Sequence, residues 1–209
     1  MNTSPQLSYH GIVLAGGGSE RMGSDKALIN YHGIPQWQWC TELLKHFCHK
    51  IFVSKNESQP WNTGTSATAV IDNEWSPGPF HPWSRLHRIK SRSYWIILTC
   101  DIPFITKKAI SDLIRDLENQ HSTFDAAAYF AAGSAFPDPQ LALLSPEACL
   151  KASEAYAAGQ RSPKRFLEQI ETLLKKPTDL SWLNACNTRE QCEQAQNYLK
   201  QNNPQGDSS

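Results

Sequence analysis

The sequence has no excess of charge of either sign. Its 209 residues carry 20 Lys and Arg against 20 Asp and Glu, so the formal net charge at pH 7 is zero. Proteins that bind nucleic acid or anionic membranes through their overall field carry an excess of positive charge. We therefore expect no nucleic acid and no membrane as a partner, and any phosphate group must be bound locally.

Targeting signals and paired cysteines are also lacking. No run approaches the ~18 apolar residues that cross a bilayer, and residues 1–6 lack the basic-then-apolar order of a signal peptide. The six cysteines are scattered without a C-x-x-C pair, whereas disulfide scaffolds are cysteine-dense and zinc sites pair their ligands closely. These absences predict reduced thiols and a soluble cytoplasmic protein.

Strand and helix patterns alternate along the chain. We expect strands at residues 11–14, 51–54, 67–71, 94–100, 126–130 and 141–144, and helices at 35–49 and after the capping residues Thr106, Ser145, Ser162 and Thr188. This alternation predicts an α/β fold of three layers, a mostly parallel sheet flanked by helices. Residues 9–201 are expected to form a single domain between disordered tails at 1–8 and 202–209.

The predicted helix at 35–49 decides between two interpretations of its cysteines and histidines. Cys40, His46, Cys48 and His49 could gather a metal ion, but apolar residues recur at helical spacing from Cys40 to Ile51. The sulfur atoms of Cys40 and Cys48 would then face the core while the histidines point elsewhere. We favour a core helix over a metal site.

A glycine-rich segment follows the first expected strand, running from Leu14 through Gly16, Gly17 and Gly18 and continuing past Arg21 to Lys26. It is not a P-loop, because Lys26 stands too late, and not a dinucleotide fingerprint, because Arg21 replaces the third glycine. Glycines at a strand end let backbone N–H groups face an anion, while Arg21 and Lys26 add positive charge. The segment therefore favours bound nucleotide phosphates over an ordinary glycine turn with two solvated cations.

The strongest strand signal, residues 94–100, ends at Asp101. In parallel sheets, ligands bind beyond the carboxyl ends of the strands. A carboxylate in that place, next to Pro103, can hold a hard cation between protein and phosphates. The alternative is an Asp that only caps a helix or a loop.

Together these motifs resemble the molybdenum cofactor guanylyltransferases, a family within the Rossmann-like nucleotidyltransferases. The similarity is dense over residues 11–104 and thin beyond, where 139–143 and 184–188 match later motifs only loosely. Gly17, where cytidylyl members have a second alanine, is similar to guanylyl members. Besides the glycine-rich segment, the matching positions are Gly33-Ile34-Pro35, Asn56, Asp72, Gly78-Pro79 and the run from Cys100 to Phe104.

The resemblance implies a reaction, a metal and a set of site residues. GMP would pass from GTP to molybdopterin cofactor, giving molybdopterin guanine dinucleotide and pyrophosphate, with Mg²⁺ as cofactor. Molybdoenzymes or cofactor chaperone proteins would be its protein partners. Arg21, Lys26 and Asp101 would be catalytic. The nucleotide would contact Leu14, Ala15, Gly16, Gly17, Asn56 and Asp72, its phosphates Lys26, and the Mg²⁺ ion Asp101.

One segment departs from the family pattern. After Gly78-Pro79 the family usually continues Leu-Ala-Gly, whereas this chain reads Phe80-His81-Pro82-Trp83. Proline and tryptophan change backbone freedom and pocket volume, so the segment is either a family variant that repacks this loop or a site for a different acceptor. Trp75 and Trp83 are the tryptophans placed to touch a ligand. A nucleotidyltransferase for another base or acceptor, cytidylyl or sugar-phosphate, stays open. So does a nucleotide-binding partner protein without transfer activity.

Overall fold

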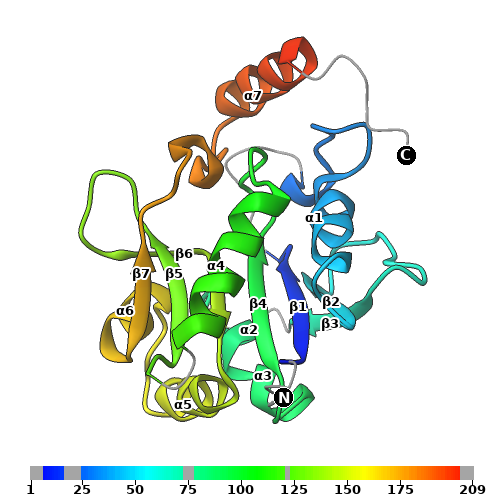
Figure 1. The fold of residues 1–209 in the computed structure, drawn as a ribbon. Helices are drawn as coiled ribbons and strands as arrows, with labels where there is room; N and C mark the ends of the chain where they lie inside the picture. Colours follow the sequence, from blue (N-terminus) through cyan, green and yellow to red (C-terminus); the bar gives the residue numbers. More distant parts are fainter. Residues whose placement is uncertain (1–6, 17–24, 73–77, 121–122, 203–209) are drawn as a thin grey trace, which may run out of the picture.

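The computed structural model describes residues 7–16, 25–72, 78–120 and 123–202 (Figure 1). These residues form a seven-stranded sheet in the order β3-β2-β1-β4-β6-β5-β7. Only β6 runs antiparallel to its neighbours within the described sheet, so the sheet is mostly parallel, as predicted. The strands are β1 (Tyr9–Leu14), β2 (Lys50–Asn56), β3 (Thr68–Asp72), β4 (Tyr94–Thr99), β5 (Ala126–Phe130), β6 (Pro137–Leu144) and β7 (Thr172–Lys175).

Helices cover both faces of the sheet, which gives the three predicted layers (Figure 1). One face packs against α1 (Gln36–Lys45) and α4 (Lys107–Gln120). The other packs against the remaining helices of the body, which are α2 (His81–Ser84), α3 (Leu86–Ile89), α5 (Pro146–Ala157) and α6 (Pro163–Gln169). The short 3-10 helices η1 (Lys26–Leu28) and η2 (Leu180–Leu183) contribute Ala27, Trp182 and Leu183 to the core under α1 and α4. The last helix is α7 (Arg189–Asn202).

The central strand β4 shows why the core has two halves. Successive side chains of a strand point to opposite faces. Ile96 and Leu98 therefore pack under α1 and α4, whereas Trp95 and Ile97 pack under the helices of the opposite layer. All four side chains are fully buried, which accounts for the continuous apolar run in the sequence.

The predicted helix caps are confirmed. The hydroxyl of Ser145 accepts a hydrogen bond from Ala148 N at 3.0 Å, and that of Ser162 accepts one from Arg165 N at 3.3 Å. At the start of α7, Thr188 and Gln191 form the predicted capping box, because each side chain accepts from the other's backbone N–H.

The prediction for the first long helix was wrong at its carboxyl end. α1 ends at Lys45, and the chain turns so that His49 N donates to Tyr9 O at 3.0 Å and leads into β2. Ile51 therefore belongs to β2 rather than to the helical stripe. Cys40 is fully buried as expected, whereas Cys48 lies beyond the helix and is half-buried.

No helix among the described residues has the length and apolar character needed to cross a membrane.

Candidate active site

The site is built at the carboxyl ends of four neighbouring parallel strands. Leu14 at the end of β1 pairs with Ser54 of β2 on one side and Thr99 of β4 on the other, while Asn56 of β2 pairs with Asp72 of β3. The backbone stays tied at this edge because Gly16 N donates to Ser54 O at 2.9 Å. Candidate residues that are far apart in the sequence thus share one edge of the sheet.

Gly16 lies where no side chain fits without displacing its neighbours. A Cβ atom there would stand 3.1 Å from Asn56 Oδ1 and 3.3 Å from Asp72 Oδ2. Contacts this tight require the neighbouring groups to move. The structure therefore brings three of the predicted residues together, an amide and a carboxylate around a bare stretch of backbone.

Asp72 is buried next to β2 and α2. One carboxylate oxygen accepts a hydrogen bond from the Ser54 hydroxyl of β2. The other lies 3.3 Å from His81 Nδ1 of α2 and 3.5 Å from Arg85 Nη1, which follows α2. Neither of these two contacts is a hydrogen bond, because Asp72 Oδ1 and His81 Nδ1 find no hydrogen-bond partner among the described residues. The Ser54 hydroxyl is therefore the group that orients the carboxylate.

A hydrogen-bond network that sequence analysis did not predict connects the two ends of the glycine-rich segment. Gln59 Nε2 donates to Ala15 O at 3.0 Å and to Asp25 Oδ2 at 2.8 Å, and Gln59 Oε1 accepts from Asn56 N at 2.7 Å. Trp61 Nε1 donates to the same Asp25 oxygen at 2.7 Å. Residue 59 therefore joins the chain before and after residues 17–24, which lie outside the described structure along with the candidates Gly17 and Arg21.

Lys26 meets the carboxyl-terminal part of the chain. Asp25 caps the start of η1, the short helix that contains Lys26, because its Oδ1 atom accepts a hydrogen bond from Ala27 N at 3.0 Å. Lys26 Nζ donates to Asn187 Oδ1 at 2.7 Å. In the same segment, Cys186 N donates to Asp101 O at 2.8 Å. Residues 184–188, where the sequence similarity is thin, are thus part of the site.

Asp101 has the surroundings of a cation ligand. Its Oδ1 atom is buried and finds no hydrogen-bond partner among the described residues. A buried carboxylate oxygen without a partner is costly, and a hard cation would satisfy it. The backbone beside it is held by His32, whose ring Nε2 lies 2.8 Å from Pro103 O. The chemistry of this position therefore fits Mg²⁺.

Asp138 of β6 adds a second carboxylate in this region. Burial raises the pKa of its carboxyl group, and the negative charge of Asp101 raises that pKa further. The electrostatic effect of Asp101 shows that the two carboxylates lie near one another. Sequence analysis missed this residue, because it lies between Pro137 and Pro139, before the strand predicted at 141–144, whereas β6 begins at Pro137.

The matching family is the one whose model describes a MobA-like NTP transferase domain, over residues 11–173. The matched range holds the glycine-rich segment, Asn56, Asp72 and Asp101. The chain belongs to this family. It is a nucleotidyltransferase, as its sequence predicted.

Two curated relatives carry related names. The molybdenum cofactor biosynthesis bifunctional protein of Synechocystis sp. is 31% identical over 176 residues, 84% of this chain and 50% of that protein. The molybdenum cofactor guanylyltransferase of Pseudomonas entomophila is 29% identical over 158 residues, 75% of this chain and 80% of that protein. The chain thus spans half of the first relative and most of the second.

Solved structures share the fold. Molybdopterin-guanine dinucleotide biosynthesis protein A of Archaeoglobus fulgidus superimposes with a TM-score of 0.72 at 18% identity, over 92% of this chain and 99% of that one. CMP:2-keto-3-deoxy-manno-octonic acid synthetase gives 0.68 at 13% identity, over 93% and 99%. The Rossmann-like nucleotidyltransferase fold is confirmed, while identities this low show the fold alone.

The segment from Phe80 to Trp83, which departs from the family pattern, forms a helix that packs into the core of this MobA-like transferase. Phe80 and Trp83 are 0% and 1% exposed and pack against Phe166 of α6. The expectation that Trp83 touches a ligand was therefore wrong, and Trp75 lies outside the described residues. The signal for burial was the spacing of three between Phe80, Trp83 and Leu86, which puts large apolar side chains on one side of α2 and α3.

Proposed function

We propose that this MobA-like transferase moves GMP from GTP to the terminal phosphate of molybdopterin cofactor, with pyrophosphate as the second product. The observation that carries the proposal is the shared edge of the sheet. At this edge Gly16, Asn56 and Asp72 surround one position and Asp101 follows β4. Lys26 contacts Asn187, next to the residue whose N–H donates to Asp101 O. The names of the two curated relatives support molybdopterin as acceptor.

The nucleoside would bind where Gly16 leaves room beside Asn56 and Asp72. The Asn56 side-chain amide offers both a donor and an acceptor, and the Asp72 carboxylate accepts from N–H or O–H groups. The Ser54 hydroxyl orients the Asp72 carboxylate, and Asp72 Oδ1 finds no hydrogen-bond partner among the described residues, so this atom can accept from a ligand. This arrangement orients the nucleoside before reaction.

The phosphates would lie between Lys26 and Asp101. Lys26 supplies a positive charge, and its contact with Asn187 keeps the ammonium group on the site. Arg21 would add a second cation. Asp101 would hold Mg²⁺, which when bound neutralises charge on the phosphate oxygens. The loop amides and these side chains together stabilise the charge that develops during transfer.

No side chain needs to act as a base. The second pKa of a phosphate monoester is about 6, so the acceptor phosphate is largely ionised near pH 7. Its oxygen forms a bond to the α-phosphorus of GTP as the bond from that phosphorus to the bridging oxygen breaks, and pyrophosphate leaves with the electron pair. What the protein supplies is in-line positioning and charge stabilisation.

The deciding experiment measures pyrophosphate release from GTP, Mg²⁺ and purified molybdopterin cofactor. We expect Lys26→Ala and Asp101→Ala each to abolish transfer. Lys45→Ala is the matched control and should retain wild-type rates, because Lys45 is an exposed lysine of α1 that forms an ion pair with Glu42 of the same helix. Full activity of either site variant would contradict the proposal.

The base and acceptor are tested separately. Calorimetric titration with GTP, CTP and UTP is expected to show the tightest binding for GTP. Preference for CTP or UTP would favour a cytidylyl or sugar-phosphate enzyme. Binding of GTP without turnover on any pterin acceptor would favour a nucleotide-binding partner protein.

We also propose that the enzyme acts in the cytoplasm. All six cysteines are unpaired in the structure. Free thiols persist in reducing compartments.

A further inference from the structure

A cavity of about 400 Å³ lies between α2, α3 and α5, beside the end of β3. These helices belong to the layer that covers the Trp95 face of the sheet (Figure 1). The cavity volume is within the roughly 300–1,000 Å³ of small-molecule sites. Among the described residues proposed to bind GTP or Mg²⁺, none lines this cavity. It is therefore separate from the candidate active site.

One wall of the cavity carries basic side chains. His81, Arg85 and Arg88 line it, at spacings of four and three residues along α2 and α3. Arg85 has helical backbone angles, so this spacing puts the basic side chains on one side of the helical segment. The side formed by α5 adds the hydroxyl groups of Ser153 and Tyr156, which can donate to a ligand oxygen. The lining thus offers several hydrogen-bond donors to an anion.

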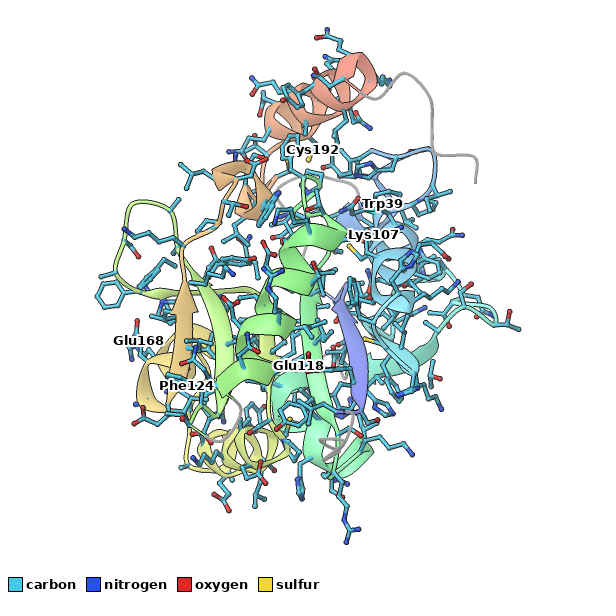
Figure 2. The ribbon with its side chains drawn as sticks, in the orientation of Figure 1. Trp39, Lys107, Glu118, Phe124, Glu168 and Cys192 are labelled. Carbon is cyan, nitrogen blue, oxygen red and sulfur yellow. The ribbon has the colours of Figure 1, made fainter. Side chains whose placement is uncertain are left out.

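The acidic groups nearby do not cancel this positive charge. No Asp or Glu among the described residues lines the cavity. Asp72 contacts the basic side chains from outside the lining, with its Oδ1 atom 3.3 Å from His81 Nδ1 and 3.5 Å from Arg85 Nη1. Glu168, on α6 of the same layer, lies at the outer edge of the molecule (Figure 2). Two guanidinium groups thus stand against one carboxylate, and the cavity favours an anionic ligand.

The two arginines of the lining differ in how they are held. Arg85 Nη1 donates to Ile71 O at 2.7 Å, which fixes its guanidinium group beside the edge strand β3. Arg88 is exposed and has no hydrogen-bond or ion-pair partner among the described residues. Arg88 can therefore bind an anion without breaking an existing contact, and the paired N–H groups of arginine match the oxygens of a phosphate.

The rings on the two sides of the cavity are packed in place. The ring centroids of His81 and Tyr156 lie 5.5 Å apart. The Arg161 guanidinium group lies 4.1 Å from the centroid of the Tyr156 ring, and its Nη1 atom donates to Tyr156 O at 2.8 Å. His81 Nδ1 is buried against Asp72, so Nε2 is the ring nitrogen left for a ligand. This part of the lining is therefore preformed.

We propose that this cavity binds a phosphate group, at a site distinct from the one proposed for the GTP phosphates. Arg85, Arg88 and the His81 ring donate to the phosphate oxygens. The cavity has room for roughly a dozen water-sized groups, more than a phosphate ion fills, which favours a phosphate ester of a small organic molecule. The proposal gives a role to His81, a residue of the segment that departs from the family pattern. It does not depend on GMP transfer.

Calorimetric titration of the full chain with inorganic phosphate and with ribose 5-phosphate, in the absence of GTP and Mg²⁺, tests this proposal. We expect Arg88→Gln to weaken binding about tenfold, the effect of one lost charge-assisted hydrogen bond. Ser153→Phe should abolish binding, because a large ring fills the cavity without changing its charge. Arg92→Gln is the matched control, since Arg92 is exposed, follows α3 and does not line the cavity. Thermal unfolding followed by circular dichroism checks that each variant folds.

Lys26→Ala separates this cavity from the candidate active site and should bind phosphate as the wild type does. Loss of binding in Lys26→Ala but not in Arg88→Gln would place the phosphate at the active site and overturn the proposal. Equal loss in Arg88→Gln and Arg92→Gln would show an effect of net charge alone and overturn it too. Absence of binding to the wild type would have the same consequence.

The two ligands distinguish the source of the phosphate. Tighter binding of ribose 5-phosphate, weakened in Arg88→Gln, supports an organic ester as the ligand. Tighter binding of inorganic phosphate with the same dependence on Arg88 supports the site and identifies the free ion as its ligand. None of these measurements requires GMP transfer, so a negative result leaves the proposed function standing.

Discussion

The buried histidine His10 makes the folded state sensitive to acid. Its ring lies between Phe52 and Trp95, with centroids 6.3 and 5.6 Å away. Burial lowers the pKa of His10 below the ordinary value of 6.5, and the positive charge of Lys90 lowers it further. The unfolded chain therefore binds a proton more readily than the folded one. Stability is full above about pH 6.5 and falls as the pH drops toward the lower folded-state pKa.

Replacing this histidine by an apolar ring should flatten that dependence. For His10→Phe we expect a smaller loss of unfolding free energy between about pH 7.5 and 5.5 than for the wild type, measured by urea unfolding. Some dependence remains, because burial also lowers the pKa of His32. The exposed His46 supplies the control, since His46→Phe should keep the wild-type slope. The same slope in His10→Phe would contradict the assignment of acid sensitivity to this residue.

The residues of the candidate site differ in how well the sequence predicted them. Asp101 was predictable, because it follows a continuous apolar strand and the chemistry of strand ends is general. Gly16, Asn56 and Asp72 were named from the family resemblance, and the structure places them together. Gln59 and Asp138 were not predictable, because their importance comes from partners 34 or more positions away in the chain, such as Asp25 and Asp101.

At the scale of elements, Gln59 acts as a positioning residue between β2 and η1. Its side chain donates to Ala15 O and to Asp25 Oδ2, near the two ends of the glycine-rich segment, and accepts from Asn56 N. We expect Gln59→Leu to raise the KM for GTP about tenfold, because a hydrogen bond to a charged group contributes about 1.5 kcal/mol. Steady-state kinetics with kcat and KM measured separately provide the readout, with a smaller change in kcat.

The neighbouring Asn62 offers the control for that prediction. Asn62 is exposed, and its side chain accepts a local hydrogen bond from Gly64 N at 2.9 Å. Asn62→Ala should leave the KM for GTP unchanged. Equal kinetics of Gln59→Leu and wild type would show that the network does not position the nucleotide.

Elements with strong local signals were predictable, and those defined by distant contacts were not. β5 was predicted at its observed bounds, and α5 and α6 began after their predicted serine caps. β7 was missed because it is short, half-buried and defined by pairing with β5. α2 and α3 were missed because each has four residues, too few for a periodic pattern to emerge.

At the scale of the whole molecule, the thiols report on the integrity of the fold. Cys40, Cys100 and Cys149 are buried, and burial raises the pKa of each thiol. Since the thiolate is the reactive form, the native protein should react slowly with a disulfide reagent such as dithionitrobenzoate. The half-buried Cys48 is the expected exception, although burial raises its pKa to about 12.

Spectrophotometric titration checks this expectation. All six thiols should react promptly in denaturant, and the native protein should show at most a slow, partial reaction led by Cys48. Cys48→Ser then removes the earliest phase. Prompt reaction of all six thiols in the native protein would show that the two cores open readily.

The contact between Lys26 and Asn187 joins residues 161 positions apart, so it has a consequence for biosynthesis. A ribosome makes the amino-terminal part of a chain first, and that part begins to fold while the rest is still being added. β1 to β4 are therefore translated well before Asn187. The contacts that Asn187 makes with Lys26 and that Cys186 makes with the Asp101 backbone form only near the end of translation. An incomplete chain can thus form the sheet but not the finished site.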